Sequence, residues 1–97
     1  MTEYLEPEYD GRKSFYKKAE VKHGVREDGK PVTMLYSYDL MVAMVMELNG
    51  QENVHIRGTF SATTLRHIRE FLMQFTKLPW LTKKEIQDIV DEGSVYT

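Results

Sequence analysis

Four stretches of the chain alternate apolar and polar side chains with a period of two, the pattern of a half-buried β-strand. They span residues 14–22, 32–38, 40–48 and 54–60. The stretch 40–48 is apolar on both sides of the alternation, which is typical of a central strand covered on both faces. A short helix is the alternative there, because Leu, Met and Ala also favour helices. The pair Asn49–Gly50 follows directly and is a strong hairpin signal, so it favours the strand.

After residue 60 the hydrophobic period changes from two to about 3.6 residues. The apolar stripe consists of Leu65, Ile68, Leu72 and Phe75. It predicts a helix that begins at Ser61 as N-cap and ends near residues 75–77. A second helix is predicted after Thr82, because Thr82 and Glu85 match the capping-box pattern. Gly93 is a typical residue at the end of such a helix.

These elements predict an α+β fold: an antiparallel sheet of about four strands followed by two helices, with the longer helix packed on one sheet face. Residues 1–12 show no sustained period, and the first ten carry four acidic groups and no basic one. We therefore expect an irregular acidic arm at residues 1–12 and a single α+β domain at residues 13–97. A chain of 97 residues has the usual size of one domain.

The composition excludes several classes of protein. The chain has no cysteine, so disulfides, thiol nucleophiles and thiolate metal sites are excluded. No apolar run approaches the ~18–20 residues of a membrane span, and the acidic start does not resemble a secretory signal. We expect a cytoplasmic protein that does not associate with membranes.

The residues that usually carry catalysis show no recognisable arrangement. His23, His55 and His67 share no metal-ligand spacing, and the six glycines form no phosphate-binding loop. Ser61 is better explained as a helix cap than as a nucleophile. We therefore expect no catalytic residue, no metal and no cofactor, and a protein that is not an enzyme.

The candidate binding surface is a set of arginines and tyrosines. Arg66 and Arg69 are spaced i, i+3 on the predicted outer side of the first helix. Arg57 on the preceding strand, with Tyr36 and Tyr38, extends this partner-binding surface, because arginine and tyrosine are frequent interface anchors. A protein is the first candidate partner. Nucleic acid, bound through a local basic patch, is the second, since the net charge of −2 argues against general phosphate binding.

Other interpretations of the same residues stay open. Arg66 and Arg69 can form an ordinary solvated surface, with Glu70 pairing with Arg66 one turn away. The binding surface can also be the acidic arm or the acidic side of the second helix. That side carries Asp88, Asp91 and Glu92.

Methionine is concentrated in and beside the two central predicted strands. The residues are Met34, Met41, Met44 and Met46. We interpret them as core filling, and an adaptable binding surface is the alternative.

A resemblance to a known family of proteins rests on three stretches of the chain, residues 16–19, 36–39 and 54–72. With the Ser-x-Thr-Thr-Leu-Arg-His-Ile block at residues 61–68, the chain resembles a family of small, largely uncharacterised proteins of phages and plasmids in Gram-positive bacteria. The resemblance covers about residues 15–74 and brings no catalytic residue. It implies a mobile-element accessory protein that acts by stoichiometric binding, with inhibition of a CRISPR effector nuclease as its narrower form. The alternative is a small DNA-binding accessory or regulatory protein.

Overall fold

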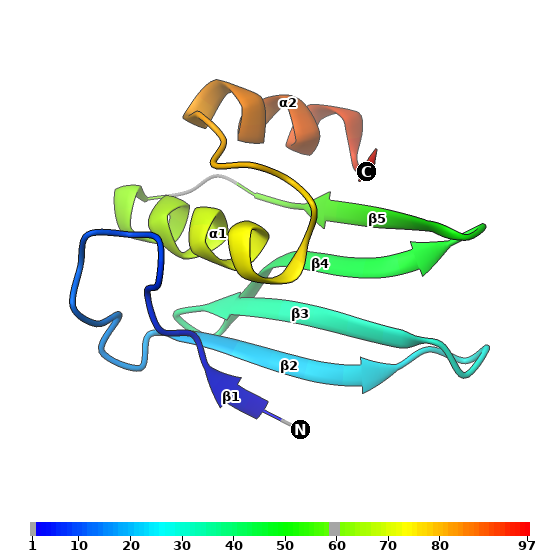
Figure 1. The fold of residues 1–97 in the computed structure, drawn as a ribbon, viewed down its shortest axis with the longest axis horizontal. Helices are drawn as coiled ribbons and strands as arrows, with labels where there is room; N and C mark the ends of the chain where they lie inside the picture. The colour runs from blue at the N-terminus through cyan, green and yellow to red at the C-terminus, as the bar shows by residue number, and fades with distance from the viewer. Residues whose placement is uncertain (1, 59–60) are drawn as a thin grey trace.

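The computed structural model describes residues 2–58 and 61–97 and shows an α+β fold built around one antiparallel sheet (Figure 1). Its strands follow one another in chain order, each paired with the next. They are β1 (Thr2–Tyr4), β2 (Ala19–Val25), β3 (Pro31–Ser37), β4 (Leu40–Leu48), β5 (Gln51–Ile56) and β6 (Val95–Tyr96). The helices are α1 (Ala62–Phe75) and α2 (Lys83–Glu92). The prediction of about four strands was therefore wrong in number, because β1 and β6 extend the sheet at its two edges.

Turn residues explain the connections between the central strands. Asn49 and Gly50 both have positive φ and join β4 to β5 as a tight hairpin, as the sequence predicts. Residues 40–48 form β4 and not a helix. Phe60, expected on the last of the four predicted strands, lies outside the described residues.

The sheet has one covered and one open face. Directly opposed residues Val21, Leu35, Ala43 and Ile56 form a row across four strands, and each is almost completely buried. The adjacent row consists of Lys22, Met34, Met44 and His55, all partly exposed. Because neighbouring residues of a strand point to opposite faces, the first row lies under the helices and the second faces away from them. The interpretation of the central methionines as core filling was wrong for Met34 and Met44.

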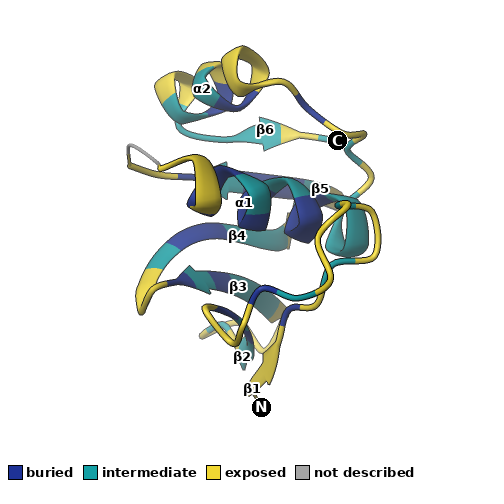
Figure 2. Ribbon diagram, turned by 90° about the vertical axis from the view of Figure 1, so that its left-hand side faces the viewer, coloured by how far each residue is buried: buried dark blue, intermediate teal, exposed yellow. Residues whose placement is uncertain are grey.

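The helix α1 covers the sheet over β3 and β4 (Figures 1 and 2). Its apolar side buries Leu65, Ile68 and Leu72, as the 3.6-residue period predicts. Ser61 is its N-cap and accepts a hydrogen bond from the Thr64 amide at 3.1 Å. The longer helix therefore packs on one sheet face, as expected.

The helix α2 lies beside β5 and is capped as the sequence predicts. Thr82 Oγ1 accepts from the Glu85 amide at 3.2 Å, and the Glu85 carboxylate accepts from the Thr82 amide at 2.9 Å. Gly93 follows the helix with φ of 90°, and the chain then returns as β6 along β5. Among the described residues, no helix is both long and apolar enough to cross a membrane.

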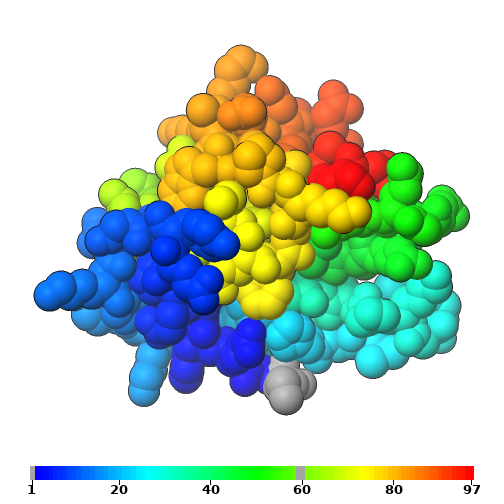
Figure 3. All heavy atoms as spheres, in the orientation of Figure 1, coloured from blue at the N-terminus to red at the C-terminus, as the bar shows by residue number. Residues whose placement is uncertain are grey.

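The first residues of the chain are not an irregular arm. Thr2–Tyr4 pairs with β2, and Leu5, which is 2% exposed, joins the hydrophobic core. Residues 5–18, called the N-terminal segment below, then pass over the side of α1. Figure 3 shows this segment (blue) in direct contact with the residues at the end of α1 (yellow), where Gln74 Nε2 donates to the Glu6 carbonyl at 2.8 Å.

Candidate functional site

A cavity of about 360 Å³ lies between the N-terminal segment, the β3–β4 turn and the first turns of α1. The N-terminal segment contributes Arg12, Ser14, Phe15, Tyr16 and Lys18 to its lining. Tyr38 comes from the turn, and Thr63, Arg66 and His67 come from α1. The volume falls in the range of small-ligand sites, and the lining combines three cationic side chains with aromatic rings.

Glu70 fixes the N-terminal segment against α1. Its side chain is completely buried, and its carboxyl oxygens accept from the amides of Tyr9 at 3.0 Å and Asp10 at 2.9 Å. Gln74 Nε2 donates to the same carboxyl group at 2.7 Å. The bonds to the two amides join residues 61 and 60 positions apart in the sequence, so the cavity forms only when the tertiary fold is complete.

Asp10 positions the side chain of Arg66 and the backbone of Arg12 at the cavity. Its side chain is 2% exposed, and it accepts from Arg66 Nη1 at 3.0 Å and from the Arg12 amide at 2.9 Å. The Arg66 side chain stays 42% exposed beside this carboxylate. Because Asp10 restrains the guanidinium of Arg66 before any ligand binds, less conformational entropy is lost when Arg66 binds a further anion.

His67 is the most deeply buried residue of the cavity lining. Its Nδ1 lies 2.8 Å from Ser37 Oγ, and Ser37 Oγ lies 3.0 Å from Thr64 Oγ1. The Phe15 ring packs edge-on against the imidazole with centroids 4.6 Å apart. Burial lowers the pKa of His67 from 6.5 to about 4, although the nearby Asp10 carboxylate acts in the opposite direction. The imidazole is therefore neutral at pH 7.

One polar atom of this cluster has no partner. Nε2 of His67 is buried and has no hydrogen bond to any residue that the structure describes. Buried polar groups are nearly always paired, since leaving one unpaired costs roughly 1–3 kcal/mol. Nε2 of His67 is therefore an unpaired, buried polar atom beside the cavity.

The backbone around the cavity is strained. Tyr16, Lys17, Tyr38 and Asp39 all have φ between 51° and 70°, in the left-handed region that non-glycine residues seldom adopt. Such conformations cost of order 1 kcal/mol or more and are concentrated at functional sites. Here they place two tyrosines on the lining of one cavity.

The structure brings together two of the five predicted binding residues. Arg66 and Tyr38 both line the cavity. Arg69 lies elsewhere, because its Nε donates to the Leu81 carbonyl at 2.7 Å and its guanidinium lies 5.7 Å from the Trp80 ring. Arg69 therefore does not line the cavity together with Arg66.

The other two predicted residues are on the sheet. Tyr36 lies in β3 on the face that the helices leave open, with Lys22 Nζ 4.2 Å from its ring centroid. Arg57 is exposed just after β5. Glu70 does not pair with Arg66, since its hydrogen bonds go to the N-terminal segment and to Gln74.

Sequence reasoning missed the residues that the N-terminal segment supplies and the buried position of His67. A signal for His67 was present, because Thr64, His67 and Phe71 share the i, i+3, i+7 spacing of an inward-facing stripe. A signal for the segment was the basic stretch 11–18, which contains four cationic residues and no acidic one. Neither signal indicates that these two parts of the chain meet.

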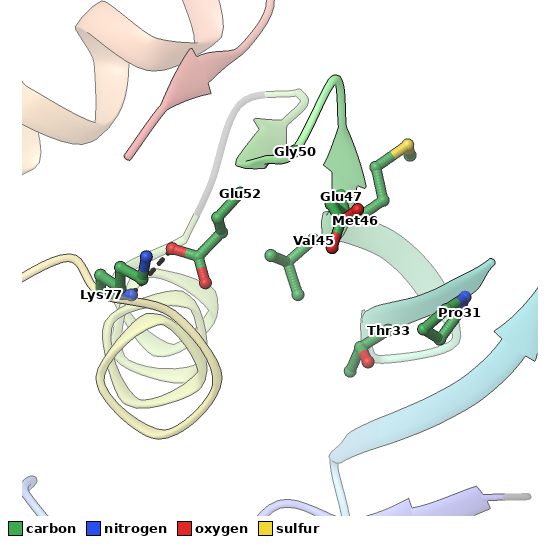
Figure 4. Close-up of a pocket in the computed structure, with 8 residues that line it drawn as sticks. All are labelled: Pro31, Thr33, Val45, Met46, Glu47, Gly50, Glu52 and Lys77. Atoms are coloured by element: carbon green, nitrogen blue, oxygen red, sulfur yellow. Dashed lines mark hydrogen bonds between the residues drawn. The ribbon is translucent and has the colours of Figure 1, made fainter.

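A second hollow, of about 300 Å³, lies at the other end of the sheet (Figure 4). Thr33, Val45 and Glu52 line it together with Lys77. The Glu52 carboxylate already accepts from the Lys77 amide at 2.9 Å and from the Thr97 hydroxyl. It therefore links β5 to the residues after α1 and to the end of the chain. Within residues 2–58 and 61–97, no cluster of three histidine or acidic side chains could hold a metal. The basic cavity is therefore the stronger candidate.

The fold and this cavity define a small two-layer α+β protein with a basic, aromatic-lined cavity beside its longer helix. The chain belongs to the family of unknown function DUF8033, whose sequence model matches residues 4–88. The matched range contains every residue that lines the basic cavity, including those supplied by the N-terminal segment. No curated protein and no solved structure matches the chain.

Proposed function

We propose that this protein is a non-catalytic binding protein that associates stoichiometrically with a protein partner through the basic cavity. The observation that carries the proposal is the convergence of Arg12, Lys18 and Arg66 with Tyr16 and Tyr38 around one hollow. Arginine and tyrosine are typical interface anchors, and cationic side chains around a hollow favour an anionic group of the partner. The partner is therefore expected to insert an anionic group here.

The hydroxyl groups near His67 support a binding role over catalysis. Ser37, the residue hydrogen-bonded to the imidazole, is 2% exposed and does not line the cavity, so a substrate does not reach it. Ser61 is used as the helix cap. A nucleophile must be accessible to its substrate as well as adjacent to a base. The Ser37–His67 pair therefore orients the imidazole.

The mobile-element setting and the inhibition of a CRISPR effector nuclease are the narrower forms of this proposal. They are supported by the sequence resemblance of residues 15–74. The rival proposal is DNA binding, for which the cavity cations are the supporting observation. Purified protein mixed with duplex DNA at ~150 mM salt separates the two, because binding by charge alone largely fades there. A retained, sequence-dependent shift contradicts the protein-partner proposal.

The direct test uses a pair of matched double variants as bait for the partner. Arg12→Ala with Lys18→Ala removes two exposed cations from the cavity, and Lys83→Ala with Lys84→Ala removes two exposed cations from α2. We expect the first variant to lose at least ten-fold in partner affinity and the second less than two-fold, because a central anchor contributes about 1–2 kcal/mol or more. Equal binding by both variants contradicts the proposal.

A further inference from the structure

The charges around the cavity do not balance. The three cations Arg12, Lys18 and Arg66 share the site with the carboxylate of Asp10, which leaves a surplus of two positive charges. The first turn of α1, where Thr63 lines the cavity, carries no acidic residue to offset the positive end of the helix dipole. A group with two negative charges would neutralise this surplus.

The polar groups on the inner side of the cavity are hydrogen-bonded to one another. The Ser61 hydroxyl donates to Thr64 Oγ1 at 3.3 Å. Ser37 Oγ lies 3.0 Å from Thr64 Oγ1 and 2.8 Å from Nδ1 of His67. Because Ser37 and His67 are buried, the exposed cations of the lining supply the contacts to a ligand.

The cationic groups of the lining are all hydrogen-bond donors, since guanidinium and ammonium groups have no acceptor. A phosphate monoester can accept from several donors at once through three oxygens and carries close to two negative charges at pH 7. A carboxylate has one charge and two oxygens.

We infer that the basic cavity is a phosphate-binding site that takes a phosphate monoester, held by Arg12, Lys18 and Arg66. The inference rests on the proposed function, because it names the anionic group that the partner presents. Tyr16 and Tyr38 line the same cavity and are both well exposed, so their rings contact the group that carries the phosphate. Contact between rings favours an aromatic carrier.

Titration with small probes at ~150 mM salt tests the inference. Phenyl phosphate should bind saturably and about ten-fold more tightly than benzoate, which has the same ring but a single carboxylate charge. The Arg12→Ala, Lys18→Ala variant should lose about ten-fold in phenyl phosphate affinity, and the Lys83→Ala, Lys84→Ala control less than two-fold. Equal binding of benzoate and phenyl phosphate, or equal loss in both variants, overturns the inference.

The source of the phosphate is resolved by two larger probes. A peptide with one phosphorylated tyrosine that binds more tightly than adenosine monophosphate indicates a phosphate carried by the protein partner. The opposite order indicates a free nucleotide and contradicts the proposed function while the phosphate site stands. If the partner binds through the cavity but neither probe does, the proposed function stands and the phosphate inference is wrong.

Discussion

His67 and Glu70 are polar residues three positions apart on α1, and both are completely buried. Such residues are seldom fully buried unless their polar atoms are paired. Glu70 is paired with two amides of the N-terminal segment and with Gln74, whereas Nε2 of His67 has no partner among the residues that the structure describes. At the scale of residues, Glu70 therefore holds the N-terminal segment beside the cavity, and His67 is a neutral, buried imidazole.

Glu70→Ala should destabilise the protein strongly. The change removes the carboxylate that accepts three hydrogen bonds, so the backbone amides of Tyr9 and Asp10 lose their acceptor. We expect a loss of about 2–4 kcal/mol in the free energy of unfolding, measured by urea denaturation. Glu92→Ala, an exposed acidic residue of α2, is the control and should change stability by less than about 0.5 kcal/mol. A Glu70→Ala protein as stable as the control contradicts the role of Glu70.

His67 should make stability depend on pH. Its pKa is about 4 in the folded state and 6.5 when unfolded, so between these values the unfolded chain binds the extra proton. The contribution of the neutral His67 to the free energy of unfolding is fully present above pH 6.5 and is lost as the pH falls toward 4. At pH 5 the loss from this group is about 2 kcal/mol relative to pH 7.5.

The measurement compares urea denaturation of the protein and of His67→Gln at pH 7.5 and 5. The variant lacks this titration, so the difference between the two pH dependences isolates His67 from the other groups of the cavity. These are Asp10, Arg12, Tyr16, Lys18, Tyr38 and Arg66. Imidazole proton signals supply a second readout in the unmodified protein, and titration of His67 near pH 6.5 contradicts the prediction.

At the scale of elements, the hydrophobic periods predicted the four central strands and both helices. Local signals decide these elements: alternation for β4, the Asn49–Gly50 turn after it, and the capping box at Thr82. The edge strands β1 and β6 are two or three residues long, too short to show a period, and they form because a neighbouring strand offers unpaired backbone groups. The cavity was not predicted, because it depends on contacts such as Tyr9 with Glu70 that no local pattern encodes.

The N-terminal segment should behave as part of the core and not as a detachable arm. Leu5→Ala should lower the free energy of unfolding by about 2–4 kcal/mol, because the side chain is fully packed among core residues. Glu8→Ala, an exposed residue of the same segment, is the matched control and should have little effect. Thermal or urea unfolding measures both, and a Leu5→Ala protein with unchanged stability contradicts this view of the segment.

At the scale of the whole molecule, the two faces of the sheet differ in structure. The helices cover one face (Figure 1), and the basic cavity lies between α1, the β3–β4 turn and the N-terminal segment. The other face presents partly exposed Met34, Tyr36 and Met44 without a charged cluster of the same kind. The chain as a whole has a net charge of −2, so the surplus of positive charge at the cavity is a local feature of the surface.

The most direct test of the cavity as the binding site is mapping of backbone amide chemical shifts during titration with phenyl phosphate at ~150 mM salt. We predict saturable shifts confined to the lining of the cavity. These should be largest in residues 12–18, at Tyr38 and in residues 63–67. Shifts centred on the open sheet face around Met34 and Met44, shifts at the second hollow around Glu52, or no saturable shift at all would contradict the account.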